Sequence, residues 1–412
     1  MRKSLTYKIL AAVMALSAAN WAVPANVLAD EYIVKQDGEI ISDDCDVVYG
    51  NGHNFTINGG TINGDVYGVG NDNYDEAASG GNVTINGNAT VTGNVFGGYS
   101  DYSNTYNNTV NISSNSVRGY VFGGYASGSA NNNTVNISGD TVGRVYGGYA
   151  SGSANDNTVN ISGDTVDRVY GGCASGSAND NTVNISGGTI YWSAYVYGGC
   201  ASGSANDNTV NISGGTICLS AYVYGGYANG SANDNTVNIS GNAKVTGNVY
   251  GGWSNNDSAN DNTVNISGSA DIENANLYGS YNDTDTGNTL TIDGWSGSTK
   301  SVKNFNDIAF KNINWNENKP VLTITVGSAD DLENTTIDTI HIAGGSDINV
   351  DESKTLIKNN GTLNSIGNVT DAFTAGVARE GLGSTSVDKT TGEVSFKVNS
   401  IKLSSQAVSA AQ

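Results

Sequence analysis

The chain has little of what builds helices, metal centres and most active sites. Its 412 residues include 2 Pro, 2 His, 2 Met and 4 Cys, and only 14% are charged. Helix-forming residues are scarce, whereas Val, Ile, Thr, Tyr, Asn and Gly dominate, which favours strands and turns. The 55 Gly follow no every-third-residue rule, which excludes collagen. Disorder is the alternative for so polar a chain, but regular Val-x-Ile and Val-Tyr pairs argue against it.

Basic residues are also few, with 18 Lys and Arg against 39 Asp and Glu and a net charge of −21. A surface of this sign repels phosphate backbones, so we expect no nucleic-acid partner and interpret the acidity as an aid to solubility. His53 and His341 stand in unrelated contexts without a nucleophile motif, and there is no P-loop or dinucleotide fingerprint. We therefore expect a protein that is not an enzyme and has no cofactor.

Long apolar runs are missing except at the start of the chain. The run from Ile9 to Ala19 is too short to span a membrane and follows basic residues, which is typical of a signal peptide. The small residues before Asp30 predict a signal peptide of residues 1–29, with cleavage after Ala25 as the alternative. The protein is therefore expected to be exported.

Two short motifs recur in phase along the chain. The first, Val-Tyr/Phe-Gly, begins at Val66, Val95, Val121, Val145, Val169, Val196, Val223 and Val249. The second, Val/Leu-x-Ile, begins at Val83, Val110, Val135, Val159, Val183, Val210, Val237, Val264 and Leu290. The spacing of 24 to 29 residues holds at least two short strands with turns between them. One such unit cannot bury a core alone, so the units must stack.

Alternation within the second motif indicates how the units stack. In residues 158–162, Val159 and Ile161 point to one side, and Asn160 points to the other. Stacking then gives an internal ladder of Val and Ile and an external ladder of amides that hydrogen-bond along the axis. The Gly-Gly pair after each Val-Tyr predicts a sharp corner with backbone angles that favour glycine. We predict an all-β, right-handed parallel β-helix of about ten coils.

The regular repeat ends near Trp295. Residues 30–295 are predicted to form the repeat β-helix, and residues 296–412 a less regular continuation and C-terminal β cap. Strand-like runs persist in the second segment, but a regular period is gone. Solenoids need atypical ends to protect open strand edges, which is the role we predict for this cap.

Three sets of repeated side chains are candidates for function. Tyrosines in an exposed stripe could contact a ligand such as a sugar, with a packed aromatic ladder as the alternative. These candidates are Tyr146, Tyr170, Tyr197, Tyr224 and Tyr250. Stacked carboxylates could hold calcium, with solvated turn residues as the alternative. Those candidates are Asp156, Asp180, Asp207, Asp234 and Asp261. Cys173 and Cys200 occupy the same place in successive units, where stacking brings Cα atoms to about 4.8 Å, within reach of a disulfide. Most other units carry Tyr there, so the alternative is that Cys replaces Tyr in a ladder.

The tandem units, Gly-Ser-Ala-Asn-Asp-Asn-Thr-Val-Asn-Ile-Ser-Gly followed by Val-Tyr-Gly-Gly, resemble passenger repeats of bacterial autotransporters. Residues 304–363 resemble the region that precedes the translocator barrel in that family, and residues 401–408 resemble the lead-in to the barrel. The resemblance implies a β-helical surface protein of a diderm bacterium, on the outer membrane or outside the cell, often an adhesin. A translocator barrel is expected from the family as a partner and is not found within this chain.

These observations together predict an exported passenger protein that binds a host or neighbouring-cell glycan or protein without catalysis. Near-identical repeats argue against a unique catalytic cleft, which would need several different acids and a base together. The alternatives are a carbohydrate-active β-helix enzyme, such as a polysaccharide lyase or hydrolase, and a structural spacer without a ligand. A cleft lined by acids that are not repeated would favour the enzyme.

Overall fold

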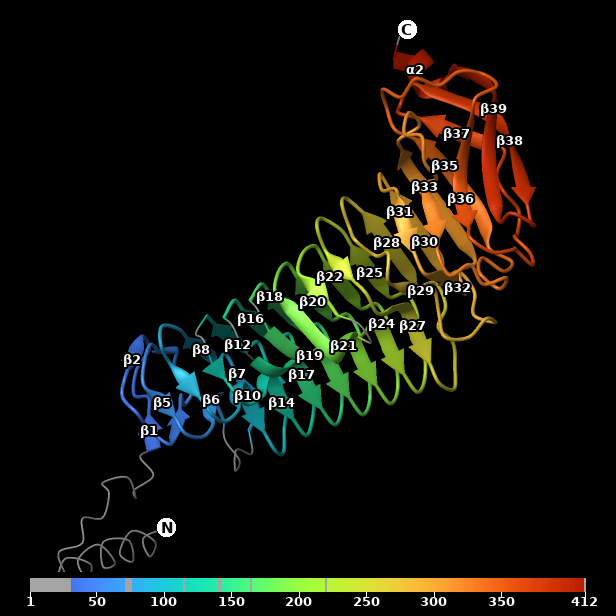
Figure 1. Cartoon of the computed structure of the whole chain (residues 1–412). Helices are drawn as coiled ribbons and strands as arrows, with labels where there is room; N and C mark the ends of the chain where they lie inside the picture. The colour runs from blue at the N-terminus through green and yellow to red at the C-terminus, as the bar shows by residue number, and fades with distance from the viewer. Residues whose placement is uncertain are drawn as a thin grey trace, which may run out of the picture. The chain divides into compact units, whose positions relative to one another are not determined.

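The computed structural model describes residues 31–70, 76–113, 116–139, 142–163, 165–218 and 221–410. The predicted signal peptide lies outside these residues. The described chain from Glu31 onward is one compact unit, a β-solenoid of about 10 turns of ~26 residues, which confirms the parallel β-helix. Figure 1 shows the turns following one another along the solenoid. In the described part of the chain, no helix has the length and apolarity needed to cross a membrane.

Sheet 1 carries the Val-Tyr-Gly-Gly segments, and all its strands run parallel to their neighbours in adjacent turns. Its main strands are β1 (Glu31–Ile33), β3 (Val47–Tyr49), β6 (Val66–Val69), β10 (Val95–Ser100), β14 (Val121–Ala126), β17 (Val142–Ala150), β19 (Thr165–Ala174), β21 (Thr189–Ala201), β24 (Tyr222–Ala228), β27 (Asn248–Ser254), β29 (Asn276–Tyr278) and β32 (Ser301–Lys303). A shorter ladder is formed by β5 (Thr61–Ile62), β9 (Thr90–Val91), β13 (Ser116–Val117), β23 (Thr216–Ile217) and β26 (Lys244–Val245), and it merges with the main strands in β17, β19 and β21.

Sheet 2 carries the Thr-Val-Asn-Ile segments. Its main strands are β2 (Glu39–Ile41), β4 (Phe55–Ile57), β8 (Asn82–Ile85), β12 (Thr109–Ile112), β16 (Thr134–Ile137), β18 (Thr158–Ile161), β20 (Thr182–Ile185), β22 (Thr209–Ile212), β25 (Thr236–Ile239), β28 (Thr263–Ser267), β30 (Thr289–Asp293), β33 (Asp307–Ile313), β35 (Thr336–Ile342) and β37 (Ala372–Ala375). A small third sheet contains β7 (Ala78–Ser79), β11 (Thr105–Tyr106) and β15 (Ala130–Asn131). The register aligns equivalent residues, so Val159 pairs with Val183 and Val183 with Val210.

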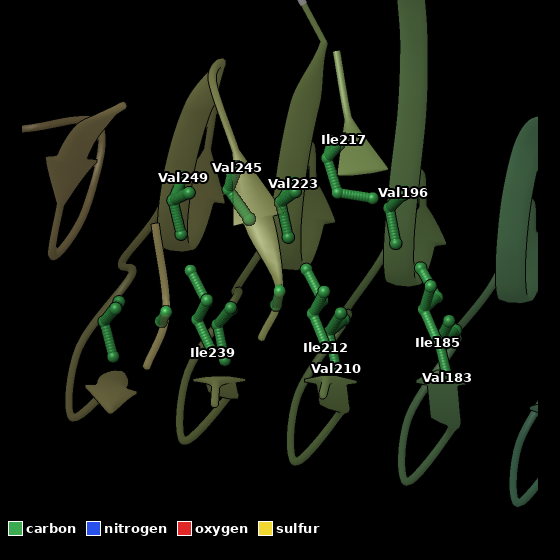
Figure 2. Packing of buried hydrophobic residues seen from close by; sticks show 14 of the residues in the cluster. Val183, Ile185, Val196, Val210, Ile212, Ile217, Val223, Ile239, Val245 and Val249 are labelled. Atoms are coloured by element: carbon green, nitrogen blue, oxygen red, sulfur yellow. The ribbon is translucent and has the colours of Figure 1, made fainter. Parts of the chain in front are cut away.

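The core lies between sheets 1 and 2 and consists mainly of Val and Ile. Val210 and Ile212 of β22 are fully buried, and Figure 2 shows them opposite Ile217 and Val223 of sheet 1. A Val or Ile moved from water into such a core contributes about 1.5–3 kcal/mol. The alternation predicted for the second motif is confirmed, because each Thr-Val-Asn-Ile strand buries its Val and Ile.

The Gly-Gly pairs contradict one prediction, because none of them has a positive φ. They are glycine for a steric reason instead. A Cβ on Gly198 would lie 2.3 Å from the carbonyl oxygen of Gly225 in the next turn and 2.8 Å from the Cβ of Asn208. Equivalent glycines meet the same obstacles in other turns, among them Gly171 and Gly225. The backbone of one turn therefore rests directly on the next at this position.

The predicted external asparagine ladder is present on sheet 2. The Nδ2 of Asn184 donates to the Oδ1 of Asn160 at 2.7 Å, and the Nδ2 of Asn211 donates to Asn184 at the same distance. These side chains are half-buried, so water can replace part of the bonding. The ladder links successive turns through side chains as well as through backbone hydrogen bonds.

A second asparagine ladder was not predicted and is fully buried. Its members, all 0% exposed, are Asn108, Asn133, Asn157, Asn181, Asn208, Asn235, Asn262 and Asn288. The Oδ1 of Asn208 accepts hydrogen bonds from both the backbone N–H and the Nδ2 of Asn181, each at 3.0 Å. The same pair of bonds joins Asn208 to Asn235. Each buried amide thus satisfies a backbone donor that would otherwise have no acceptor.

Beyond Trp295 the parallel ladder continues, but larger side chains fill the interior. Trp295, Phe305 and Phe310 belong to the buried core here, and the Nε1 of Trp295 donates to the carbonyl oxygen of Ala270 at 2.9 Å. The additional strands are β31 (Gly297–Thr299), β34 (Leu322–Ile324) and β36 (Ser353–Asn359), which pair in parallel.

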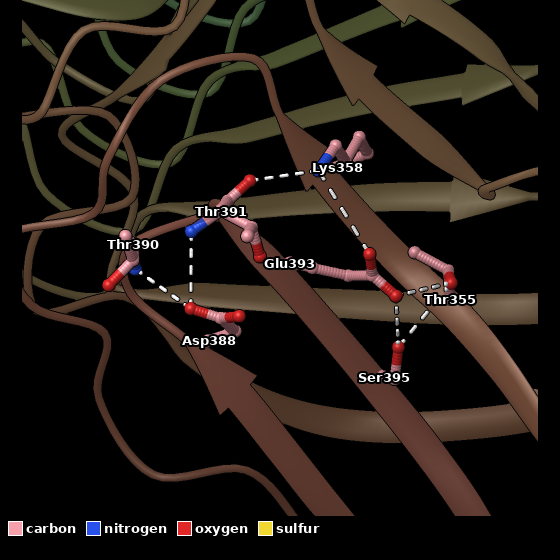
Figure 3. A network of polar contacts seen from close by, with 7 residues as sticks. All are labelled: Thr355, Lys358, Asp388, Thr390, Thr391, Glu393 and Ser395. Atoms are coloured by element: carbon pink, nitrogen blue, oxygen red, sulfur yellow. Dashed lines mark hydrogen bonds and ion pairs between the residues drawn. The ribbon is translucent and has the colours of Figure 1, made fainter.

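The C-terminal end changes from parallel to antiparallel pairing. Strands β38 (Arg379–Asp388) and β39 (Glu393–Leu403) form a hairpin that pairs antiparallel with β37 and β36, and helix α2 (Ser405–Ala410) follows. In Figure 3 the Oδ1 of Asp388 accepts the backbone N–H groups of Thr390 and Thr391, which holds the hairpin turn. Lys358 of β36 reaches the same turn by donating to the carbonyl oxygen of Thr391 at 2.9 Å. The hairpin covers strand edges as a cap does.

Candidate functional site: the aromatic face of sheet 1

The outer side of sheet 1 carries three parallel columns of side chains. The central column contains Tyr49, Tyr67, Phe96, Phe122, Tyr146, Tyr170, Tyr197, Tyr224, Tyr250 and Tyr278. The rings stack in register, with centroids 4.5 Å apart for Tyr146 and Tyr170 and 4.9 Å apart for Tyr170 and Tyr197. The column arises because Val at the preceding position points into the core, so the aromatic residue must point outward.

The predicted ligand-contact tyrosines all belong to this central column, and they are covered. Tyr146, Tyr170, Tyr197, Tyr224 and Tyr250 are between 4% and 9% exposed. Burial raises the pKa of all five. Their ring faces lie against the rings above and below, as in the packed-ladder alternative. Direct ligand contact by these five stays a prediction and is restricted to ring edges and hydroxyls.

Two flanking columns cover the central one. The glycine-side column follows each Gly-Gly pair and contains Tyr99, Tyr125, Tyr149, Cys173, Cys200, Tyr227, Trp253 and Tyr281. The arginine-side column contains Arg144, Arg168, Tyr195, Tyr222, Asn248 and Asn276. The Tyr149 ring stands edge-on to Tyr146 at 5.4 Å and 81°. We call the three columns together the aromatic face.

The glycine-side column has a notch where cysteine replaces tyrosine in two successive turns. Tyr149 stacks on Tyr125, but its other neighbour in the column is Cys173, and Tyr149 is 37% exposed. Beyond the second cysteine the column resumes with Tyr227, which pairs in register with Cys200. The notch therefore uncovers ring surface on Tyr149 and on Tyr227. The notch interrupts the aromatic repeat of this column, and a ligand could fit there between Tyr149 and Tyr227.

Cys173 and Cys200 are register neighbours on sheet 1, so the predicted adjacency is confirmed. Both are free thiols in this structure, and the disulfide stays a prediction. A hydrogen bond between the two thiols lowers the pKa of Cys173 and raises the pKa of Cys200.

Mild oxidation is expected to join Cys173 and Cys200 within one chain. The expected product is a monomer that has lost about 2 Da and no longer reacts with a thiol-specific alkylating reagent at these positions. Peptide mapping by mass spectrometry measures the link, and Cys173→Ser is the control that must abolish it. Intermolecular dimers as the main product, with no Cys173–Cys200 peptide, would contradict the prediction.

The candidate calcium aspartates occupy a turn that explains their residue type without a metal. Asp156, Asp180 and Asp207 have φ of 58°, 57° and 58°, in the left-handed region. Asn132 takes the same conformation at the equivalent position of the preceding turn. Asn and Asp are the residues other than glycine that tolerate this region best. In the part of the chain that the structure describes, no three His, Cys, Asp or Glu side chains come together as a metal site.

Repulsion within the aspartate ladder is expected to lower the free energy of unfolding slightly at neutral pH, and protonation at acid pH should remove this loss. Burial, and after it the neighbouring carboxylates, raises the pKa of Asp180 and Asp207. A raised folded-state pKa contributes stability that is present at low pH and is lost as pH rises through that pKa. The double variant D180N/D207N should therefore be more stable than the parent at neutral pH, by less than about 1 kcal/mol because the groups are exposed.

Urea unfolding of the parent and D180N/D207N at neutral pH and at about pH 3 measures this difference. The gap should close at the acid pH, where the parent carboxyls are protonated. Asp207→Val is the contrasting control, because it removes the same carboxylate but places a β-branched residue in the left-handed region. That backbone costs about 1–2 kcal/mol, so this variant should be less stable than the parent at both pH values. A gap that persists or grows in acid would contradict the repulsion.

Individual rather than repeated acids meet in a cleft of about 400 Å³ in the aperiodic end. Its lining residues are Asp283, Asp285, Lys303, Asn304, Phe305, Asn306, Asp330, Glu333 and Asn334. Asp285 is 9% exposed, and its Oδ2 has no hydrogen-bond partner among the described residues. The sequence analysis did not find this cleft, because its acids come from separate turns and share no spacing.

The fold and this face define a repeat protein of the β-solenoid class with one continuous aromatic surface. The chain matches no protein-family model, and the comparison with curated proteins gives no match. Tyr and Cys three residues after each central ring indicated the ladder of the glycine-side column from the sequence, as the alternative to a disulfide, but the arginine-side column was missed. The position of Arg144 and Arg168, two residues before the central tyrosine, was the signal for that column.

Proposed function

We propose that this chain is an exported surface protein that binds an extended ligand, a glycan or a protein segment, along the aromatic face without catalysis. The observation that carries the proposal is the aromatic face itself, which combines partly exposed ring edges, tyrosine hydroxyls and amides in register over many turns. Tyr and Trp supply large amphipathic contact area. Repeated weak contacts along one face can act together as multivalent binding.

The sequence resemblance to autotransporter passengers supports the same proposal. Export, a diderm host and a place on the outer membrane or outside the cell follow from that resemblance and from the predicted signal peptide. Secretion through a translocator barrel is part of the proposal. A spacer with no ligand is the outcome that the binding experiment below separates from it.

Binding of residues 30–412 to host cells and to glycan arrays tests the proposal. Tyr149→Ala on the aromatic face should weaken binding about tenfold, as expected for a residue at the centre of a contact surface. Tyr106→Ala is the matched control, because Tyr106 has a similar exposure, 39% against 37%, and lies on the third sheet. Equal binding by both variants and the parent, or no binding by the parent, would reject the aromatic face as a ligand site.

The acidic cleft around Asp285 favours a second candidate, a carbohydrate-active enzyme. Glycoside hydrolysis needs two differently placed carboxylates, and the cleft brings acids from separate turns to one place. Incubation with a panel of polysaccharides, followed by reducing-end analysis, tests this candidate. Turnover that Asp285→Asn abolishes would establish the enzyme, and absence of turnover leaves binding as the function.

A further inference from the structure

Two arginines stand next to each other on the aromatic face. Arg144 of β17 pairs in register with Arg168 of β19, so the two cations lie one turn apart, with backbones about 4.8 Å from each other. Both point to the same side of the sheet, where like charges at this spacing repel. In a chain with 18 basic and 39 acidic residues, two neighbouring cations need a compensating interaction.

Among the described residues, no Asp or Glu forms an ion pair with either arginine. The ion pairs found there involve His53 and five lysines, and neither Arg144 nor Arg168 takes part in one. The guanidinium groups instead lie over aromatic rings, Arg144 at 5.2 Å from the Tyr120 centroid and Arg168 at 5.1 Å from Tyr195. Stacking holds the planes in place without neutralising the charge.

Hydrogen bonds also leave the guanidinium groups with spare donors. Arg144 lies beside the hydroxyl of Tyr146, and Arg168 lies beside that of Tyr170. A guanidinium has five N–H donors, so one hydroxyl cannot satisfy it. The Nε of Arg168 is buried and has no hydrogen-bond partner among the described residues, so the donors that a ligand can reach are on the outer end of the guanidinium. Arg144 and Arg168 are therefore held in place by the rings, are half-exposed, and have more N–H donors than nearby hydrogen-bond acceptors.

We propose that Arg144 and Arg168 bind a carboxylate of an acidic glycan, so that the ligand of the aromatic face is a polysaccharide carrying uronate-type sugars. This inference rests on the proposed function and names its ligand class. Arginine binds planar carboxylates through two parallel hydrogen bonds, which suits the geometry of a sugar carboxylate. Along the same column the next two turns present Tyr195 and Tyr222, whose edges and hydroxyls are available to neutral parts of the sugar chain.

The probes are oligogalacturonate, its fully methyl-esterified form and dextran sulfate, with binding measured by calorimetry. The parent should bind oligogalacturonate at least tenfold more tightly than the methyl ester, and added salt should weaken this binding. The double variant R144Q/R168Q should lose the difference and bind both forms equally. R144K/R168K should recover part of it, because lysine keeps the charge and loses the bidentate geometry. K244Q is the matched control, since Lys244 is exposed and paired with Asp271.

The failure of this inference can be distinguished from failure of the proposed function. Equal affinity of the parent for the acid and the ester, or an R144Q/R168Q variant that keeps the preference, overturns the carboxylate site while binding along the face stands. Tighter binding of dextran sulfate overturns the choice of carboxylate. Binding to cells or proteins without binding to glycans would reject a glycan as the ligand but would leave the proposed role in surface binding intact. Circular dichroism of each variant establishes that the solenoid is folded.

Discussion

Replacing Asn208 by leucine is expected to lower the free energy of unfolding by about 3–5 kcal/mol. The Oδ1 of Asn208 is the acceptor for two buried donors of Asn181, the backbone N–H and the Nδ2. Leucine fills a similar space but leaves both donors without an acceptor, and the Oδ1 of Asn235 loses one of its two donors. Each buried polar group left unpaired costs about 1–3 kcal/mol, because no water can reach it.

Asn211→Leu is the matched control for this prediction. Asn211 is in the same turn and has the same kind of neighbour, since its Nδ2 donates to Asn184 at 2.7 Å. It lies on the half-buried outer ladder, where water can take the place of the lost partner, so we expect a loss of about 1 kcal/mol or less. Urea unfolding by circular dichroism measures both variants, and hydrogen exchange of the Asn181 amide should accelerate only in Asn208→Leu. Equal losses for the two variants would contradict a special role of the buried ladder.

The parallel β-helix could be predicted because its signal is local and repeated. Val159 and Ile161 alternate with polar residues, the same pattern returns in each turn, and stacking is the way such a unit buries its apolar side. The buried ladder was not predictable in the same way. Asn157 stands between Asp156 and Thr158 in a stretch that has the composition of a solvent-exposed turn. Its Oδ1 is buried because it accepts the backbone N–H and the Nδ2 of Asn133 in the neighbouring turn.

The candidate site was predicted in part, for a related physical reason. That Tyr146 and Tyr170 stack in one column follows from the repeat and is confirmed by the register. Their exposure does not follow from it, because it depends on which side chains later in the same strand lie over the rings. The backbone after Tyr146 brings the ring of Tyr149 edge-on against it, and that contact covers the ring that the sequence placed on the outside. The surface left for a ligand is therefore on the flanking columns.

The glycines of the Val-Tyr-Gly-Gly segments give the second large predicted effect. Gly198→Ala is expected to lower the free energy of unfolding by about 3 kcal/mol or more, the upper end of what overpacking costs. The added Cβ would lie 2.3 Å from a backbone oxygen of the next turn and 2.8 Å from the Cβ of Asn208. Neither atom can move alone, because one belongs to the parallel backbone ladder and the other to the buried amide ladder. The turns must separate, and both ladders weaken.

Two further variants separate this steric cause from backbone strain. Gly59→Ala should be nearly neutral, because Gly59 has no positive φ and the nearest atom to its added Cβ is 3.6 Å away. Gly198→Asn should be at least as destabilising as Gly198→Ala, because asparagine tolerates left-handed backbone angles but adds still more atoms. Urea unfolding measures all three, and resistance to proteolysis ranks any variant that unfolds before the titration begins. A well-tolerated Gly198→Asn would show that backbone angle, and not contact between turns, selects glycine at this position.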